Sequence, residues 1–298
     1  MKKSLILFSG LLILLFISLS FLDSSDYVVE KRLWKIQKEF KELIRDPKIV
    51  PTQKYDEVNK KYLQVIKTFS NSRLVPQIYF QVGRVYLLKK EFAKSRESYQ
   101  EVLNRYHENK SLSAEALFNI GKVYEEEGDK TKAIQVYRDI INQYSTTVIG
   151  LNAPIYLANY YLRIKDSAGS QVALREAVAF YKKVAAENPG KDFGLDALRL
   201  LSVTYLAQGN WGDSVQALRE ILLKSASTRY LTSSRSNLII KSINTVSVSQ
   251  LKDYDLPINI YQEFVDQNPS HPLTRYLVKV ISALKKFKAD SKTIKKNE

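Results

Sequence analysis

Small residues recur along this chain at long, similar intervals, and each lies in a segment with the apolar period of an amphipathic helix. Gly83, Gly121, Ala158 and Ser202 are separated by 38, 37 and 44 residues. A small side chain at one place on a helix lets a second helix pack closely against it. Almost no strand-like alternation follows Asp26. The pattern therefore predicts repeated helix pairs and excludes a core built on a sheet.

The pair between residues 114 and 140 shows the pattern most clearly. A turn at Gly128 follows its first helix, and the Asp129 side chain is placed to cap the second helix. We expect Gly121 and Ala133 to let the two helices touch, and the aromatic residues to fill the gap between neighbouring pairs. The positions that define this pair are Leu117, Ile120, Gly121, Tyr124, Ala133, Tyr137 and Ile140.

The same frame recurs before and after this pair, and partial matches lie at residues 27–65 and 257–269. Upstream its positions are Tyr79, Val82, Gly83, Tyr86, Ser95, Tyr99 and Val102; downstream they are Pro154, Leu157, Ala158, Tyr161, Ala177, Tyr181 and Val184, then Leu198, Leu201, Ser202, Tyr205, Ser214, Leu218 and Ile221.

These positions resemble the tetratricopeptide repeat (TPR), whose pattern is W-x2-L-G-x2-Y, then A-x3-F, then P. The resemblance implies an all-α, right-handed superhelical solenoid of about five to six helix hairpins, with an N-terminal hydrophobic helix before it. The expected parts are a signal peptide or membrane anchor at 1–22, an N-terminal helix at 23–50, the solenoid at 51–270, a capping helix at 271–288 and a flexible basic tail at 289–298.

Two stretches depart from the repeat frame. Between Tyr161 and Ala177 there are seven more residues than the frame requires, which indicates either an extended loop or a lengthened helix pair. Residues 234–250, which should form the first helix of the last repeat, fit the frame poorly.

The N-terminal sequence has the layout of an export signal. Lys2 and Lys3 precede an uncharged run of 18 residues, Leu5 to Leu22. Ser18 and Ser20 are small enough to mark a cleavage site, while a run of this length is near the minimum for a membrane-spanning helix. A cleaved signal and a retained anchor both stay open. Either one predicts an exported protein, in the periplasm or anchored in the inner membrane and facing the periplasm.

Cysteine is absent, which excludes disulfides, thiol catalysis and Cys-ligated metals. Repeats of this length behind an export signal are similar to those of bacterial envelope TPR proteins. Two examples are the periplasmic TPR protein of the Tol–Pal system and the TPR component of the outer-membrane β-barrel assembly machine. The second is anchored by a lipid on a cysteine just after the apolar run. This chain has Ser20 and Phe21 there and lacks that lipobox cysteine.

The TPR resemblance implies a concave face lined by first helices, which takes an extended peptide or a helix of a protein partner. Positions five and nine of each repeat are predicted to form an apolar stripe with cations along it, and a cation there can pair with a carboxylate. The Lys and Asn pair that clamps chaperone tails is missing from these positions. The predicted groove residues are Phe80, Arg84, Phe118, Lys122, Ile155, Asn159, Arg199 and Val203.

The formal net charge of +15 is spread along the chain, with one concentration of lysine between Lys279 and Glu298. This end is either a solubilising tail or a contact for an anionic membrane surface. The export signal and the lack of a nucleic-acid module argue against nucleic-acid binding.

Sequence motifs for catalysis are missing, including the P-loop, G-x-G-x-x-G, H-E-x-x-H and G-x-S-x-G. The two histidines, His107 and His271, stand in predicted turns. We expect no catalytic residue, metal or cofactor, and interpret the chain as a non-catalytic exported TPR scaffold that binds protein partners in the bacterial cell envelope. The alternatives are a membrane-anchored subunit of an outer-membrane, pilus or polysaccharide assembly or export machine, and a cell-wall hydrolase with a cryptic site.

Overall fold

The computed structural model describes residues 26–45 and 51–294, with side chains described as far as residue 290. Within these ranges every regular element is a helix, as predicted, and no strand is present. The chain divides into two compact units, Met1–Gly150 and Leu151–Glu298, and each has its own hydrophobic core. The predicted export segment at 1–22 lies outside the described residues. In the part that is described, no helix is long and apolar enough to cross a membrane.

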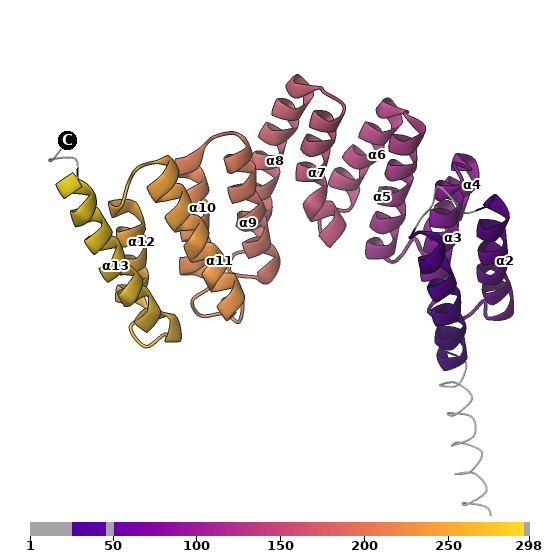
Figure 1. Cartoon of the computed structure of the whole chain (residues 1–298), viewed down its shortest axis with the longest axis horizontal. Coiled ribbons are helices and arrows are strands. Elements are labelled where there is room, and N and C mark those ends of the chain that lie inside the picture. The colour runs from indigo at the N-terminus through magenta and orange to yellow at the C-terminus, as the bar shows by residue number, and fades with distance from the viewer. Residues whose placement is uncertain (1–25, 46–50, 295–298) are drawn as a thin grey trace, which may run out of the picture. The chain divides into compact units, whose positions relative to one another are not determined.

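The first unit consists of three helix hairpins in chain order, and successive helices pack on one another (Figure 1). Its apolar residues fall on one side of each helix, so that each hairpin buries a stripe against the next. The helices are residues 26–43, α2 (Thr52–Thr68), α3 (Val75–Leu88), α4 (Phe92–Tyr106), α5 (Lys110–Glu127) and α6 (Lys130–Gln143).

The second unit contains three more hairpins and a final helix, and its first helix starts just before the unit boundary. Tyr181, Tyr261 and Phe264 are fully buried in its core. The elements are α7 (Val148–Arg163), α8 (Ser167–Glu187), α9 (Asp192–Ala207), α10 (Trp211–Lys224), α11 (Ser233–Asn244), the π-helix η1 (Thr245–Gln250), α12 (Asp255–Gln267) and α13 (Pro272–Ile294).

The turn between α5 and α6 forms as its sequence predicts. Gly128 ends α5 with a φ of 88°, a left-handed conformation that costs a residue without a Cβ very little. Asp129 Oδ1 then accepts a hydrogen bond of 3.0 Å from the backbone N–H of Lys132, which caps the start of α6.

The glycines of the repeat frame lie directly beneath tyrosine rings. A Cβ placed on Gly121 would lie 2.6 Å from Cε1 of Tyr137, and one on Gly83 would lie 2.5 Å from Cε1 of Tyr99. Each tyrosine therefore packs against the glycine of its own hairpin. The sequence predicts that the aromatic residues fill the gap between neighbouring hairpins, and for these two rings the structure shows a contact within the hairpin that the sequence did not predict. With no side chain on the glycine, the ring can lie over the helix backbone.

The structure shows the conformation of three stretches whose sequences depart from the repeat frame or follow it. The extra residues after Tyr161 lengthen α8 to 21 residues, so the lengthened helix pair is the correct alternative and the extended loop is not. Residues 245–250 form a π-helix, whose wider turn shifts the side-chain register and explains why this stretch fits the frame poorly. Helix α13 continues to Ile294, so most of the tail predicted at 289–298 is helical. No glycine or proline interrupts it before that point.

Candidate functional site

In the first unit, the predicted groove residues of α3 lie against the chain's own N-terminal helix. Phe80 is 8% exposed and belongs to the same hydrophobic core as Phe40. The Arg84 guanidinium is exposed and lies 5.6 Å from the centroid of the Phe40 ring, a cation–π contact. The apolar side chain at this place is therefore used for packing inside the unit.

The corresponding residues of α5 take part in contacts within their own hairpin. Phe118 is half-buried, with its ring centroid 5.7 Å from that of Tyr137. Lys122 Nζ lies 3.1 Å from Glu125 Oε2, and Glu125 Oε1 accepts a hydrogen bond of 2.7 Å from the Tyr137 hydroxyl. These contacts link the two helices of the hairpin through α5 side chains.

In the second unit, the predicted residues of α7 differ from one another. Ile155 is partly buried, and its backbone N–H donates a hydrogen bond of 3.3 Å to the Tyr181 hydroxyl of α8. Asn159 is exposed. Neither lines the cleft described next.

The predicted residues of α9 border a cleft on the surface of the second unit, which we call the Arg199 cleft. It has a volume of about 250 Å³ and lies between α9, α10 and α11. The Arg199 side chain is 49% exposed, Val203 is 41% exposed, and Leu238 on the opposite wall is 65% exposed. The cleft thus combines apolar and cationic groups that solvent can reach. Its wall residues include Arg199, Val203, Leu206, Tyr230, Arg235 and Leu238.

A hydrogen-bonded acid holds the cationic side of this cleft in place. The Tyr230 hydroxyl donates to Asp196 Oδ1 at 2.9 Å, and Arg199 Nε lies 3.5 Å from the same oxygen. The Arg235 guanidinium stacks on the Tyr230 ring, 4.3 Å from its centroid. Burial, followed by the nearby Asp196 carboxylate, raises the pKa of Tyr230 to about 12. The phenol therefore stays protonated at neutral pH and continues to donate its hydrogen bond.

This arrangement suits binding of a polypeptide segment. An apolar side chain could enter the cleft beside Val203 and Leu238, while a carboxylate of the same segment pairs with Arg199 or Arg235. Arg235 stacks on the Tyr230 ring, and no acidic side chain is among the described residues that line the cleft. The charge of Arg235 is therefore available to a ligand. Within the described residues, no group of three His, Asp or Glu side chains could hold a metal ion.

Four of the wall residues named above, Leu206, Tyr230, Arg235 and Leu238, were not predicted from the sequence. Tyr230, Arg235 and Leu238 precede or begin the stretch that fits the repeat frame poorly, so position counting could not place them. The exposed position of Leu238 on an amphipathic helix was the available signal, but a single exposed leucine is common on protein surfaces. By contrast, Arg199 and Val203 were predicted, and the structure places both at the cleft.

Residues 74–146 match the tetratricopeptide repeat family. The match covers α3 to α6, the two hairpins that contain Gly83 and Gly121, and it confirms the resemblance for this part of the chain. None of the curated proteins matches the sequence. The similarity to the Tol–Pal and β-barrel assembly TPR proteins stays a prediction.

Several solved structures are similar to this chain at low identity. BtubC (BKLC) from P. vanneervenii is 12% identical with a TM-score of 0.41, covering 83% of this chain and 94% of that one. The MamA protein is 18% identical with a TM-score of 0.33, and the match covers 66% of this chain and 94% of that protein. The C-terminal part of a TPR repeat-containing protein from Cytophaga hutchinsonii is 12% identical with a TM-score of 0.40, covering 74% and 80%.

Proposed function

We propose that this protein is a non-catalytic TPR scaffold, exported to the bacterial cell envelope, that binds a protein partner through the Arg199 cleft. The observation that carries the proposal is the pairing of exposed apolar side chains, Val203 and Leu238, with two arginines in one cleft. The ligand that fits is an extended or helical segment in which an apolar side chain lies next to a carboxylate. The family match at 74–146 supports a scaffold, because TPR hairpins commonly present such surfaces.

The envelope location rests on the sequence of the first 22 residues. Fractionation of cells together with N-terminal sequencing of the mature protein tests it. A form that begins after residue 20 and is released with the periplasm would support a soluble scaffold. An integral form that retains Lys2 and Lys3 would support the alternative of a membrane-anchored subunit of an assembly or export machine. Recovery in the cytoplasm would contradict export altogether.

The binding site can be tested by site-specific photocrosslinking in cells. A crosslinker placed at Leu238 should give an adduct with a defined protein, and the double charge reversal Arg199→Glu with Arg235→Glu should remove it. A control for a single charge reversal is Arg275→Glu on α13, an exposed arginine of the same unit outside the cleft, which should leave the adduct unchanged.

A second crosslinker position controls for exposure alone. Tyr276 on α13 is 46% exposed, so it reports adducts that any accessible side chain of this unit would form. Adducts of equal yield and identity from Leu238 and Tyr276 would contradict a specific partner at the cleft, as would an adduct at Leu238 that survives both charge reversals.

A further inference from the structure

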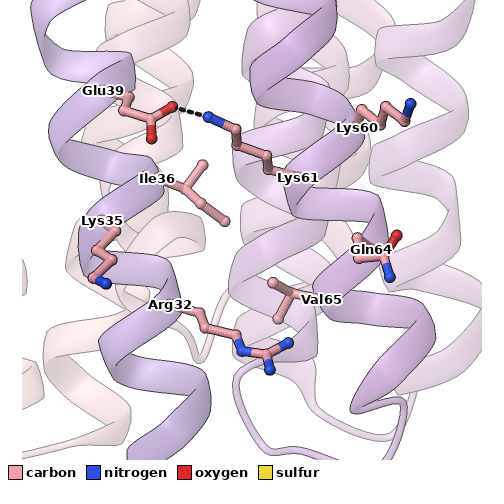
Figure 2. A pocket seen from close by; sticks show the side chains of 8 residues that line it. All are labelled: Arg32, Lys35, Ile36, Glu39, Lys60, Lys61, Gln64 and Val65. Carbon is pink, nitrogen blue, oxygen red and sulfur yellow. Dashed lines mark hydrogen bonds and ion pairs between the residues drawn. The ribbon is translucent and has the colours of Figure 1, made fainter.

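The N-terminal hairpin, formed by residues 26–43 and α2, has a basic cleft on its surface. The cleft lies between the two helices and has a volume of about 390 Å³. Figure 2 shows its apolar floor, where Ile36 and Val65 face each other. Arg32 and Glu39 lie at the two ends of one wall and are seven residues apart, which is about two helical turns or roughly 10 Å. The cleft is therefore long enough for two turns of a ligand helix.

Cations line both walls of this basic cleft, and a lysine on each wall has no acidic partner. The only carboxylate among the described lining residues, Glu39, points toward Lys61 and is paired with it (Figure 2). Lys35 on one wall and Lys60 on the other are exposed, and among the described residues no carboxylate lies within ion-pair distance of either. Charge complementarity therefore favours a ligand with anionic groups on both sides of an apolar centre.

The order of polarity from the rim of the cleft to its floor favours a polypeptide over a lipid surface. The lysines at the rim are exposed, whereas Ile36 and Val65 are 6% and 3% exposed, so a ligand must direct an apolar group inward between its anionic groups. A bilayer has the opposite order, because its phosphates are outermost and its apolar chains lie behind them. An amphipathic helix with acidic flanks carries apolar and carboxylate side chains at the same level.

The exposed rings on the same helix do not belong to this cleft. Trp34 precedes Ile36 by two residues and Tyr27 precedes it by nine. At about 100° per residue, both rings point roughly to the opposite side of the helix. A membrane that held these rings would therefore face away from the cleft.

Three other occupants fit the cleft less well. A nucleic-acid base is commonly held by stacking on an aromatic ring, and the described residues of the lining contain none. An extended peptide gains affinity from main-chain hydrogen bonds at a sheet edge, whereas both walls here are helices, whose backbone groups pair within each helix. A second copy of the chain has the same formal net charge of +15 and would be repelled.

We infer that the basic cleft binds an acidic amphipathic helix of a partner protein. An apolar side chain of this helix packs on Ile36 and Val65, and acidic side chains on its two flanks pair with Lys35 and Lys60. The ligand helix fills the groove between the two helices of the hairpin in the way that packed helices do. The inference concerns the first unit and is independent of the Arg199 cleft, which belongs to the second unit.

The test is photocrosslinking from within the basic cleft in cells that express the full chain. Gln64, an exposed residue of the α2 wall, carries the crosslinker, and mass spectrometry identifies the crosslinked segment. The expected adduct is a protein segment with net negative charge and apolar residues at every third or fourth position. An adduct with a phospholipid, with a second copy of this chain or with a segment that lacks this pattern would overturn the inference, and so would the absence of any adduct.

A synthetic peptide of the crosslinked segment then measures the contribution of the two lysines to affinity. Lys35→Gln with Lys60→Gln in the full chain should weaken binding roughly tenfold, because each exposed ion pair contributes about a factor of three. A peptide whose acidic residues are replaced by their amides should bind the wild type at least as weakly, and the lysine variants should weaken it little further. Equal affinities of the wild type for the acidic and the amide peptide would contradict recognition of charge.

The matched control is Lys38→Gln with Lys41→Gln, two exposed lysines of the same helix. They follow Ile36 by two and five residues, so they point away from the cleft. This pair removes the same charge from the same hairpin, and the affinity for the acidic peptide should change little. An equal loss for the two pairs would overturn the inference, because the overall charge of the hairpin rather than the cleft would then attract the peptide.

Discussion

Hairpins α5–α6 and α9–α10 have the same repeat frame but are joined by different side chains. In α5–α6, the Tyr137 ring lies over Gly121. The equivalent positions of α9–α10 hold Leu218 and Ser202, and the Ser202 hydroxyl lies 2.8 Å from that of Ser214 in the buried core. We call the small residue of the first helix the anchor of its hairpin. A glycine anchor requires that no side chain be present, whereas a serine anchor requires a hydrogen bond. The two kinds of hairpin should therefore respond differently to changes of similar size.

Alkaline pH should separate the two kinds of hairpin most strongly. Tyr99 in α4 lies over Gly83 as Tyr137 lies over Gly121, and burial raises the pKa of the Tyr99 hydroxyl from 10.0 to about 12. The folded state disfavours the ionised phenol. The Tyr99 hydroxyl therefore contributes about 2–3 kcal/mol to the free energy of unfolding below pH 10. This contribution is lost as the pH rises from 10 through 12.

Comparison of the wild type with Tyr99→Phe measures this contribution. The free energy of unfolding, obtained from urea titrations followed by circular dichroism, should fall more steeply between pH 10 and pH 12 for the wild type. Lysine side chains titrate over the same range in both proteins, so they cancel in the difference. Equal slopes would show that the buried hydroxyl of Tyr99 does not titrate differently on folding.

The substitution Gly121→Ala should be a damaging small change in a glycine hairpin. The new Cβ would lie 2.6 Å from Cε1 and 2.8 Å from Cζ of Tyr137, whose side chain is fully buried. Overpacking should cost about 1–3 kcal/mol, and the better helix propensity of alanine offsets only part of it. The control is Gly212→Ala in α10, where the new Cβ meets no atom within 4 Å. Unfolding midpoints in urea that move equally for both variants would contradict the role of the ring.

The sequence predicts contacts within a hairpin only where the repeat frame is intact. The frame located Gly121, Ser202 and the cap at Asp129, because small residues and caps act over a single helix or turn. It did not predict the contact between the Tyr137 ring and Gly121, because the frame gives the side of a helix on which a residue lies but not which neighbouring helix that side meets.

The Arg199 cleft shows the same limit. Its α9 wall was predicted by counting positions from the small-residue anchor. The opposite wall, with Tyr230 and Arg235, lies before or at the start of the stretch 234–250 that fits the frame poorly, and no local pattern marks it. Prediction therefore stopped where the contact depends on packing between helices that are separated by an irregular stretch.

A serine anchor should tolerate substitution better than a glycine anchor. Ser202→Ala leaves the buried Ser214 hydroxyl without its partner, which should cost about 1 kcal/mol of the free energy of unfolding. Removing both hydroxyls, with Ser202→Ala and Ser214→Ala together, should cost less than the single change because no polar group is left unsatisfied. Chemical denaturation of the two single variants and the double variant gives the coupling energy. A coupling near zero would mean that the two hydroxyls do not interact.

Substitution of Arg199 should have the smallest effect on the free energy of unfolding. This residue links the comparison of the two hairpins to function. Phe118, at the equivalent position of α5, packs on Tyr137, whereas the Arg199 side chain is about half exposed beside the cleft. Arg199→Ala removes an exposed contact with Asp196 and should change the free energy of unfolding by no more than about 0.5 kcal/mol. The same variant should lower the crosslinking yield at Leu238, because the guanidinium is available to the partner rather than to the core. If Arg199→Ala instead destabilises the second unit by more than Ser202→Ala does, position five has the same packing role in both hairpins, and the loss of crosslinking would report unfolding.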